Sequence, residues 1–118
     1  MKSENKILEM SFNFALQIID LYKLSLEKKE LVLSKQLLRS GTSIGANVEE
    51  AIAAQSRKDF ISKMSIASKE ARETRYWLKL LSKSKLVMLD YTPHLANAEH
   101  IVNILTKIVK TTQGTAPQ

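Results

Sequence analysis

The 118-residue sequence has no cysteine, three glycines and two prolines. Without cysteine, disulfides and thiolate metal sites are excluded, which suits a reducing compartment. Glycine and proline disfavour helix interiors, so their scarcity over long periodic stretches favours an all-helical chain. No apolar run approaches the ~18–20 residues that span a bilayer, and the N-terminal stretch MKSENKILEMSF lacks a signal-peptide core. We therefore expect a cytoplasmic protein that does not enter a membrane.

Groupings of residues that support catalysis are also missing. His94 and His100 are six positions apart, so they point to different faces of a helix, and there is no Glu-x-x-His pair of the di-iron bundle type. Gly41-x-x-x-Gly45 lacks the following Lys-Ser/Thr of a phosphate-binding loop, and no strand precedes it. We therefore expect no enzymatic activity, no cofactor and no metal site.

The charge that is present is positive and unevenly distributed. The net charge is +6, and residues 57–85 contain nine of the eighteen basic residues but only three acidic ones. That segment alone carries a charge equal to the net charge of the chain. A basic balance favours anionic partners such as nucleic acid.

Hydrophobic periodicity predicts four helices, at about 4–26, 31–54, 57–83 and 93–110. The expected N-caps are Ser3 and Ser56, the latter with Asp59 three residues on, and Thr92-Pro93 is a typical helix start. Helices joined by short connections pack as antiparallel neighbours. The sequence therefore predicts an all-α, up-down-up-down antiparallel four-helix bundle over residues 1–112, followed by a frayed polar tail at 113–118.

The third predicted helix has a single apolar seam, with steps of four and three residues over three heptads. A helix of ~3.6 residues per turn keeps such positions on one face, so we expect this seam to pack in the core. Its members are Phe60, Met64, Ala67, Ala71, Thr74, Leu78 and Leu81.

The second predicted helix contains two glycines, Gly41 and Gly45, each of which disfavours helix by roughly 1 kcal/mol relative to alanine. Either the helix kinks there, or the small residues allow another helix to approach closely. The same helix has a polar line that is either a solvated face or part of a hydrogen-bond network with Glu70 and Glu73 of the next helix. The line consists of Arg39, Ser43, Asn47 and Glu50.

The first predicted helix is apolar around most of its circumference. A surface helix of a monomer needs only one apolar stripe, so we infer that this helix also packs on a neighbouring subunit. We expect the small residues of the second helix to contribute to the same contact. The predicted oligomer interface contains Phe12, Phe14, Ile18, Gly41 and Gly45.

A basic line follows the third helix opposite part of its apolar seam, with one tyrosine available for base stacking. Cations on such a line gain affinity for nucleic acid by releasing counterions from phosphates, although a solvated charged face is the alternative. Trp77 lies between the lines and is expected to anchor the core or an interface. The predicted nucleic-acid-binding residues are Lys69, Arg72, Tyr76, Lys79 and Lys83, extended by Arg57, Lys58 and Lys63.

Two segments, QLLRSGTSIGANVEEA and SRKDFISKMSIASKEARETRYWLKLL, closely resemble the four-helix-bundle proteins encoded in intervening sequences of bacterial 23S ribosomal RNA genes. They are also similar to accessory proteins of diversity-generating retroelements. The resemblance implies a left-handed up-and-down bundle that assembles into a ring, with a homopentamer favoured, and a basic surface. For the retroelement branch it implies nucleic-acid association. The residues that carry the resemblance include Arg39, Ser43, Asn47, Glu50, Glu70 and Glu73.

Together these observations predict a non-enzymatic, ring-like homo-oligomer that associates with nucleic acid, with structured RNA favoured over DNA, through the basic face of its third helix. The alternative prediction is an oligomeric scaffold that binds a partner protein, such as a reverse transcriptase, and has no direct nucleic-acid role.

Overall fold

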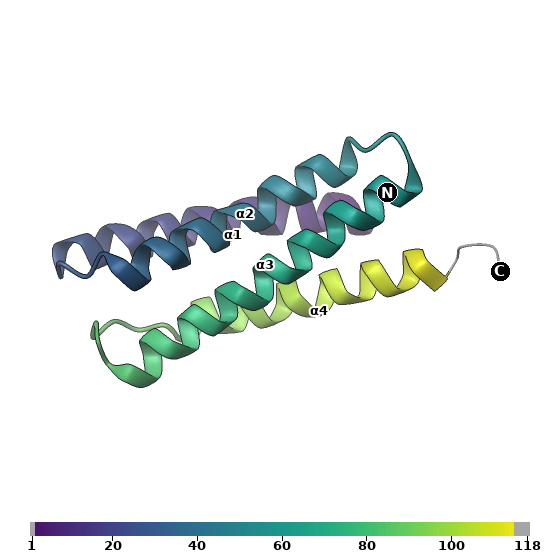
Figure 1. Cartoon of the computed structure of the whole chain (residues 1–118). Helices are drawn as coiled ribbons and strands as arrows, with labels where there is room; N and C mark the ends of the chain where they lie inside the picture. Colours follow the sequence, from purple (N-terminus) through teal and green to yellow (C-terminus); the bar gives the residue numbers. More distant parts are fainter. Residues whose placement is uncertain (1, 115–118) are drawn as a thin grey trace.

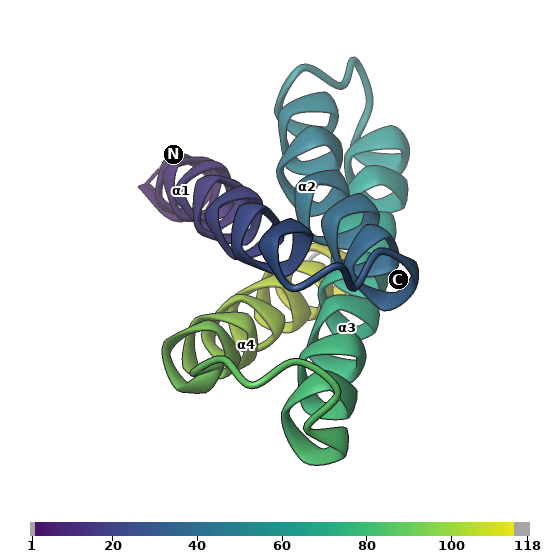
Figure 2. The same cartoon turned by 90° about the vertical axis from the view of Figure 1, so that its left-hand side faces the viewer.

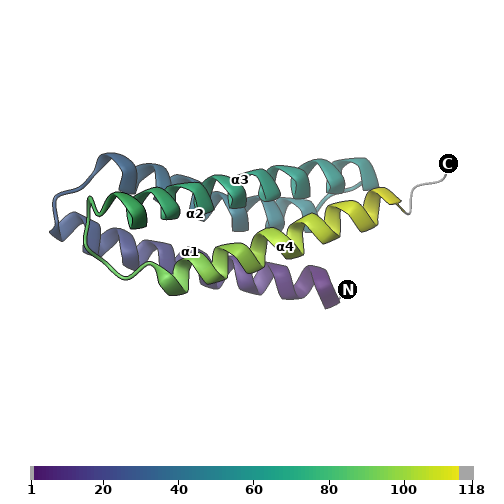
Figure 3. The ribbon, with the colours of Figure 1, turned by 90° about the horizontal axis from the view of Figure 1, so that it is seen from below.

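The computed structural model describes residues 2–114, and side chains from residue 4 onward. It contains four helices, α1 (Lys2–Glu27), α2 (Val32–Ile52), α3 (Arg57–Ser84) and α4 (Thr92–Gly114). They run alternately up and down in an elongated bundle of 51 × 22 × 22 Å (Figures 1 and 3). Around the bundle, α2 packs between α1 and α3, and α4 packs between α3 and α1 (Figure 2). The predicted all-α, antiparallel four-helix bundle is confirmed.

The observed helix bounds differ from the predicted ones by at most two residues, except at the end of α4. This helix continues to Gly114 instead of ending near Lys110. Contacts of Thr112 stabilise the additional turn, because its hydroxyl donates to the Ile108 carbonyl at 2.8 Å and its own carbonyl accepts from Arg57 at 3.2 Å. The first two residues of the predicted frayed tail are therefore helical, and positions 115–118 lie outside the described residues.

Among the described residues, side chains accept hydrogen bonds from amides at the starts of α2, α3 and α4; at α4, the Asp90 carboxylate accepts from the Thr92 amide at 3.0 Å. Ser56 is the N-cap of α3 and accepts a hydrogen bond from the Asp59 amide at 3.0 Å, which confirms the prediction. The Ser3 side chain, the predicted cap of α1, lies outside the part of the chain that is described.

The start of α2 is capped by a residue that the sequence reasoning did not single out. The Glu30 carboxylate accepts hydrogen bonds from the Leu33 and Ser34 amides at 3.0 and 2.9 Å and from the Ser34 hydroxyl at 2.6 Å. Burial raises the pKa of the Glu30 carboxyl, but these hydrogen bonds outweigh it and hold the pKa below its usual value.

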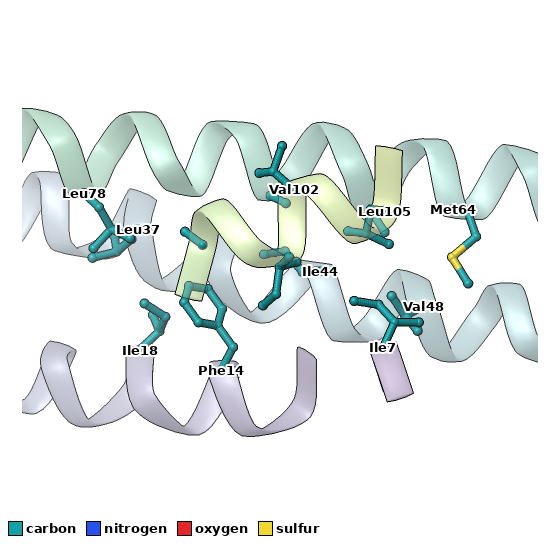
Figure 4. Close-up of a cluster of buried hydrophobic side chains, with 14 of the residues drawn as sticks. Ile7, Phe14, Ile18, Leu37, Ile44, Val48, Met64, Leu78, Val102 and Leu105 are labelled. Carbon is teal, nitrogen blue, oxygen red and sulfur yellow. The ribbon is translucent and has the colours of Figure 1, made fainter. Parts of the chain in front are cut away.

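The core runs along the inside of the bundle and uses all four helices (Figure 4). Phe14 and Ile18 of α1 point inward, Ile18 toward Leu37 of α2. Burying such a side chain stabilises the fold by about 1.5–3 kcal/mol. The predicted seam of α3 is confirmed as core: Met64, Ala67, Ala71, Thr74, Leu78 and Leu81 are buried, and Phe60 is half-buried against them.

The glycines of α2 allow a close approach within one chain. A Cβ at Gly41 would lie 3.0 Å from side-chain carbons of Ile18, and one at Gly45 would lie 3.4 Å from the Ser11 carbonyl oxygen. The helix is α-helical throughout Val32–Ile52, so the two glycines serve packing of α1 on α2 and do not interrupt the helix.

This packing corrects the predicted oligomer interface. Phe14, Ile18 and Gly41 are buried inside the chain's own core, so they are unavailable to another subunit, and Gly45 faces Ser11 of α1. Phe12 is 62% exposed and is the member of the predicted set that remains on the surface. The sequence showed that α1 has two apolar stripes, but periodicity does not indicate which of two similar stripes faces the core.

Candidate nucleic-acid interface

The predicted basic line forms one continuous surface on the outer side of α3. Lys69, Arg72, Lys79 and Lys83 are all exposed, and Tyr76 between them is 57% exposed. The steps of three and four residues keep these side chains on one face of the helix. The buried seam occupies the opposite face. The structure therefore brings together the five residues at the centre of the predicted site.

The three predicted extensions of this line do not all belong to it. Lys58 is exposed and, at about 100° per residue, shares the face of Lys69. Arg57 instead reaches the carbonyl of Thr112 at the C-terminal end of α4. Lys63 is partly buried and lies about 120° around the helix from Lys69, on a different face.

On the flank that faces α2, the carboxylates of α3 are paired. Arg39 of α2 donates to both oxygens of Glu70 at 3.4 Å and makes an ion pair with Glu73. The Trp77 indole N–H donates to Glu73 at 3.0 Å. Hydrogen bonding from Trp77, together with the adjacent Arg39 guanidinium, holds the pKa of the Glu73 carboxyl below its usual value.

Only one member of the predicted polar line on α2 takes part in this network. The Ser43 hydroxyl donates to the Arg39 carbonyl at 2.6 Å, and the Asn47 amide donates to the Ser43 carbonyl at 2.9 Å. These are bonds within α2, where polar side chains often satisfy the backbone one turn earlier. Glu50 is exposed and makes no hydrogen bond or ion pair within residues 4–114.

The two adjacent aromatic residues of α3 have different environments. Trp77 is half-buried and packs against the core, as predicted for an anchor. Tyr76 contacts it in a T-shaped arrangement, with ring centroids 5.2 Å apart, and is more than half exposed. The Tyr76 ring is thus held by Trp77 while it stays accessible from solvent.

On the opposite flank, α3 and α4 border a surface groove of about 350 Å³. Sequence reasoning found its α3 residues Lys69 and Arg72 but missed the contribution of α4, whose only signal was polar residues at helical steps. Arg72 reaches across to the Thr106 hydroxyl at 3.3 Å. The groove is lined by Ser65, Ser68, Lys69, Arg72, Thr106, Val109, Lys110 and Gln113.

Other candidate chemistry does not converge in the described part of the chain. No group of three His, Cys, Asp or Glu side chains there could hold a metal ion. His94 is partly buried, and its Nδ1 has no hydrogen-bond partner among residues 4–114, whereas His100 is exposed. Burial lowers the pKa of His94, and the nearby Asp90 carboxylate opposes that effect. None of the helices in residues 2–114 has the length and apolarity needed to cross a membrane.

The chain is similar to known proteins over almost its whole length. The family model for the 23S rRNA-intervening sequence protein matches residues 3–107. A crystal structure of a protein from the S23 ribosomal protein family of Bacteroides thetaiotaomicron, described as of unknown function, is 48% identical and superimposes with a TM-score of 0.86. The match covers 92% of this chain and 98% of that one. No curated protein matches. The bundle, the polar residues of α2 and α3 and the family match together show that the chain belongs to the 23S rRNA-intervening sequence protein family.

Proposed function

We propose that this protein is a non-enzymatic, ring-like oligomeric four-helix bundle that associates with structured RNA through the outer face of α3. The observation that carries the proposal is the separation of charges on this helix. Four cations and Tyr76 line the exposed face, while Glu70 and Glu73 are turned toward Arg39 on another flank. The exposed face therefore has an excess of positive charge that attracts anions, and Glu73, the carboxylate that interacts with Lys69, is already paired with Arg39.

The physical basis of the interaction is electrostatic. Lysine and arginine side chains gain affinity by releasing the counterions that condense on a polyphosphate, and an accessible tyrosine adds stacking on an unpaired base. The face presents no set of amide or carboxylate side chains arranged to read base edges. The expected recognition is therefore of shape and charge, and membership of a family named after an intervening sequence of 23S rRNA makes structured RNA the first ligand to test.

Oligomerisation would strengthen this interaction by repeating the face around a ring. Exposed apolar side chains of α1, including Phe12 and Leu16, support a subunit contact on this helix. We expect Phe12→Glu to lower the sedimentation coefficient without lowering the melting temperature, because the side chain lies outside the core. Ile18→Glu is the contrasting variant and should unfold the chain. An unchanged sedimentation coefficient for a folded Phe12→Glu protein would place the contact elsewhere.

The deciding experiment is titration of a fluorescent structured RNA, and of a DNA duplex of matched length, across a salt series. We expect binding that weakens steeply with salt, and a loss of about 100-fold or more at 0.1 M salt when Lys69, Arg72 and Lys79 are replaced by alanine. The control replaces Lys6, Lys28 and Lys35, three exposed lysines away from this face, and changes the net charge equally. Absence of binding at low salt, or equal losses in the two triple variants, contradicts the proposal.

A second candidate function, a scaffold for a partner protein such as a reverse transcriptase, is favoured by apolar side chains at one end of the bundle. The α1–α2 and α3–α4 connections lie at the same end (Figure 3), where Val32 is 75% and Met88 72% exposed, next to Leu31 and Leu86. Exposed apolar groups gathered in this way are typical of protein-binding surfaces. If RNA does not bind at low salt, this end becomes the surface to test, with Val32→Asp and Met88→Asp as variants.

A further inference from the structure

The groove between α3 and α4 has a geometry suited to one chemical group. Successive turns of α3 contribute Ser65, Ser68 and Arg72, and the antiparallel α4 contributes Thr106, Lys110 and Gln113 from the other side. A volume of about 350 Å³ falls within the range of small-molecule sites, at its lower end. The groove can therefore hold a ligand about the size of a nucleotide.

The lining carries charge of one sign. Lys69, Arg72 and Lys110 provide three positive charges, and none of the lining residues is acidic. The carboxylates of these helices that lie closest in sequence are paired with other cations, Glu70 and Glu73 with Arg39 and Glu99 with Arg75 at 2.8 Å. Lys69 also attracts the Glu73 carboxylate, whereas Arg72 and Lys110 have no carboxylate partner in residues 4–114. This excess of positive charge favours an anionic ligand.

The hydrogen-bond donors of the groove are available. Within residues 4–114, the hydroxyls of Ser65 and Ser68 and the ammonium group of Lys110 make no hydrogen bond or ion pair. Ser68 lines the groove but is only 7% exposed, so it lies deep between the two helices. Arg72 uses one N–H group on Thr106, which holds the guanidinium in place and leaves its other donors free.

Ammonium, guanidinium and hydroxyl donors around one space match the oxygens of a phosphate better than those of a carboxylate, because a phosphate offers more acceptors. We propose that the α3–α4 groove is a binding site for a phosphate ester and that it seats a backbone phosphate of the RNA strand bound along α3. The second part rests on the proposed function. Lys69 and Arg72 belong to both surfaces, so the groove is continuous with the basic face, and α4 becomes a second contributor to binding.

The matched variants are Lys110→Gln and Lys107→Gln. Both remove one exposed lysine from α4, but only Lys110 lines the groove. For the RNA, we expect Lys110→Gln to weaken binding about fivefold at 0.1 M salt. The slope of log affinity against log salt concentration should become shallower by about one, which corresponds to one lost phosphate contact. Lys107→Gln should weaken binding less than about twofold. Thr106→Val, which removes the hydroxyl that positions Arg72, should weaken binding about two- to fivefold while leaving the fold intact.

The second arm separates a free phosphate ester from a polymer. Uridine 5′-monophosphate is titrated into the ¹⁵N-labelled protein, with uridine as the control that lacks the phosphate. We expect amide shifts confined to residues 65–72 and 106–113 with the nucleotide, no such shifts with uridine, and their loss in Lys110→Gln.

Each outcome decides between the two parts. RNA binding that depends on Lys79 and Lys83 but not on Lys110, with no nucleotide shifts, overturns the groove and leaves the proposed function standing. Nucleotide binding in the groove without RNA binding overturns the proposed function and identifies a site for a free phosphate ester. Equal effects of Lys107→Gln and Lys110→Gln on RNA binding would show that only the net charge of α4 matters. That result overturns the assignment of the groove as a phosphate site.

Discussion

The two flanks of α3 differ in how they treat charge and space. Toward α2, the helix is tightly packed: a buried hydrogen bond of 2.9 Å joins the Thr74 and Ser40 hydroxyls, and its carboxylates are paired with Arg39. Toward α4, part of the interface opens into a groove in which Lys69 and Lys110 have no carboxylate partner in the lining. The α2 flank satisfies its polar groups within the chain. The α4 flank does so at the Arg75–Glu99 ion pair, but its groove leaves donors for an external ligand.

α3 carries both acidic and basic residues, but its exposed surface is mainly positive. Because Glu70 and Glu73 are drawn to Arg39, the positive residues dominate the outward face and the α4 flank. Stability is therefore expected to depend on the α2 flank, and binding on the outward face and the α4 flank. Four variants, in order of decreasing effect on stability, test these expectations.

The largest effect is expected for Gly41→Leu, which changes the packing of α2 on α1 and not a flank of α3. A Cβ alone would already lie 3.0 Å from Ile18, so a leucine overfills the contact between α1 and α2. We expect a loss of about 3 kcal/mol in the free energy of unfolding, seen as a melting temperature lower by about 10 °C or more. Gly45→Ala is the control: its Cβ would make ordinary contact with Ser11 at 3.4 Å, and alanine favours helix. A Gly41→Leu melt equal to wild type would contradict the close approach.

The buried hydroxyl pair should contribute about 1 kcal/mol. Thr74→Val keeps the side-chain shape but removes the hydroxyl that lies 2.9 Å from the Ser40 hydroxyl and 2.7 Å from the Glu70 carbonyl, while the Ser40 hydroxyl still donates to the Leu37 carbonyl at 3.3 Å. Urea unfolding of Thr74→Val, Ser40→Ala and the double variant forms a cycle. We expect the double variant to lose about 0.5–1 kcal/mol less than the sum of the single losses. Strict additivity would show that the two hydroxyls do not interact.

The paired carboxylates should give a smaller, pH-dependent effect. Because the folded-state pKa of Glu73 is lowered from its ordinary value of 4.5, its contribution to stability is fully present above that value and is lost as pH falls through the lower folded pKa. We expect Glu73→Gln to cost less than about 1 kcal/mol at pH 7, since the pair is partly solvated, and progressively less as pH falls below 4.5. The measurement is urea unfolding of both proteins from pH 7 to pH 2. A difference that persists unchanged at pH 2 would contradict an ionic origin.

The smallest effect on stability is expected in the groove. Lys110 makes no contact with a carboxylate in residues 4–114, so Lys110→Gln should leave the melting temperature within about 2 °C of wild type, even where RNA binding weakens. A marked loss of stability would show that the α4 flank is structural, and the contrast between the two flanks would fail.

Much of the architecture follows from residues whose signal is local. The seam from Met64 to Leu81 identifies the core face of α3, because a helix repeats its faces every 3.6 residues whatever it packs against. Ser56 caps α3 through an amide three residues away, so its role is also contained in the sequence. The basic line with Tyr76 could be predicted in the same way, because its residues recur at helical steps on the side of α3 opposite the seam.

What depends on a second helix was less accessible. Gly41 indicated a close approach, but nothing in its neighbourhood specified that the partner would be Ile18 of the same chain and not of another subunit. The capping role of Glu30 could not be predicted, because it depends on how the chain turns before α2 begins.

The number of helices, the core face of α3 and the excess of positive charge on that helix could be predicted from the residues, since composition and periodicity are properties of each helix alone. Three features could not: which stripe of α1 is buried, where Glu70 and Glu73 are paired, and that Lys110 and Thr106 join Lys69 and Arg72 around one groove. Those outcomes depend on the rotation and axial offset of one helix against another, and these are fixed by packing of all four helices together.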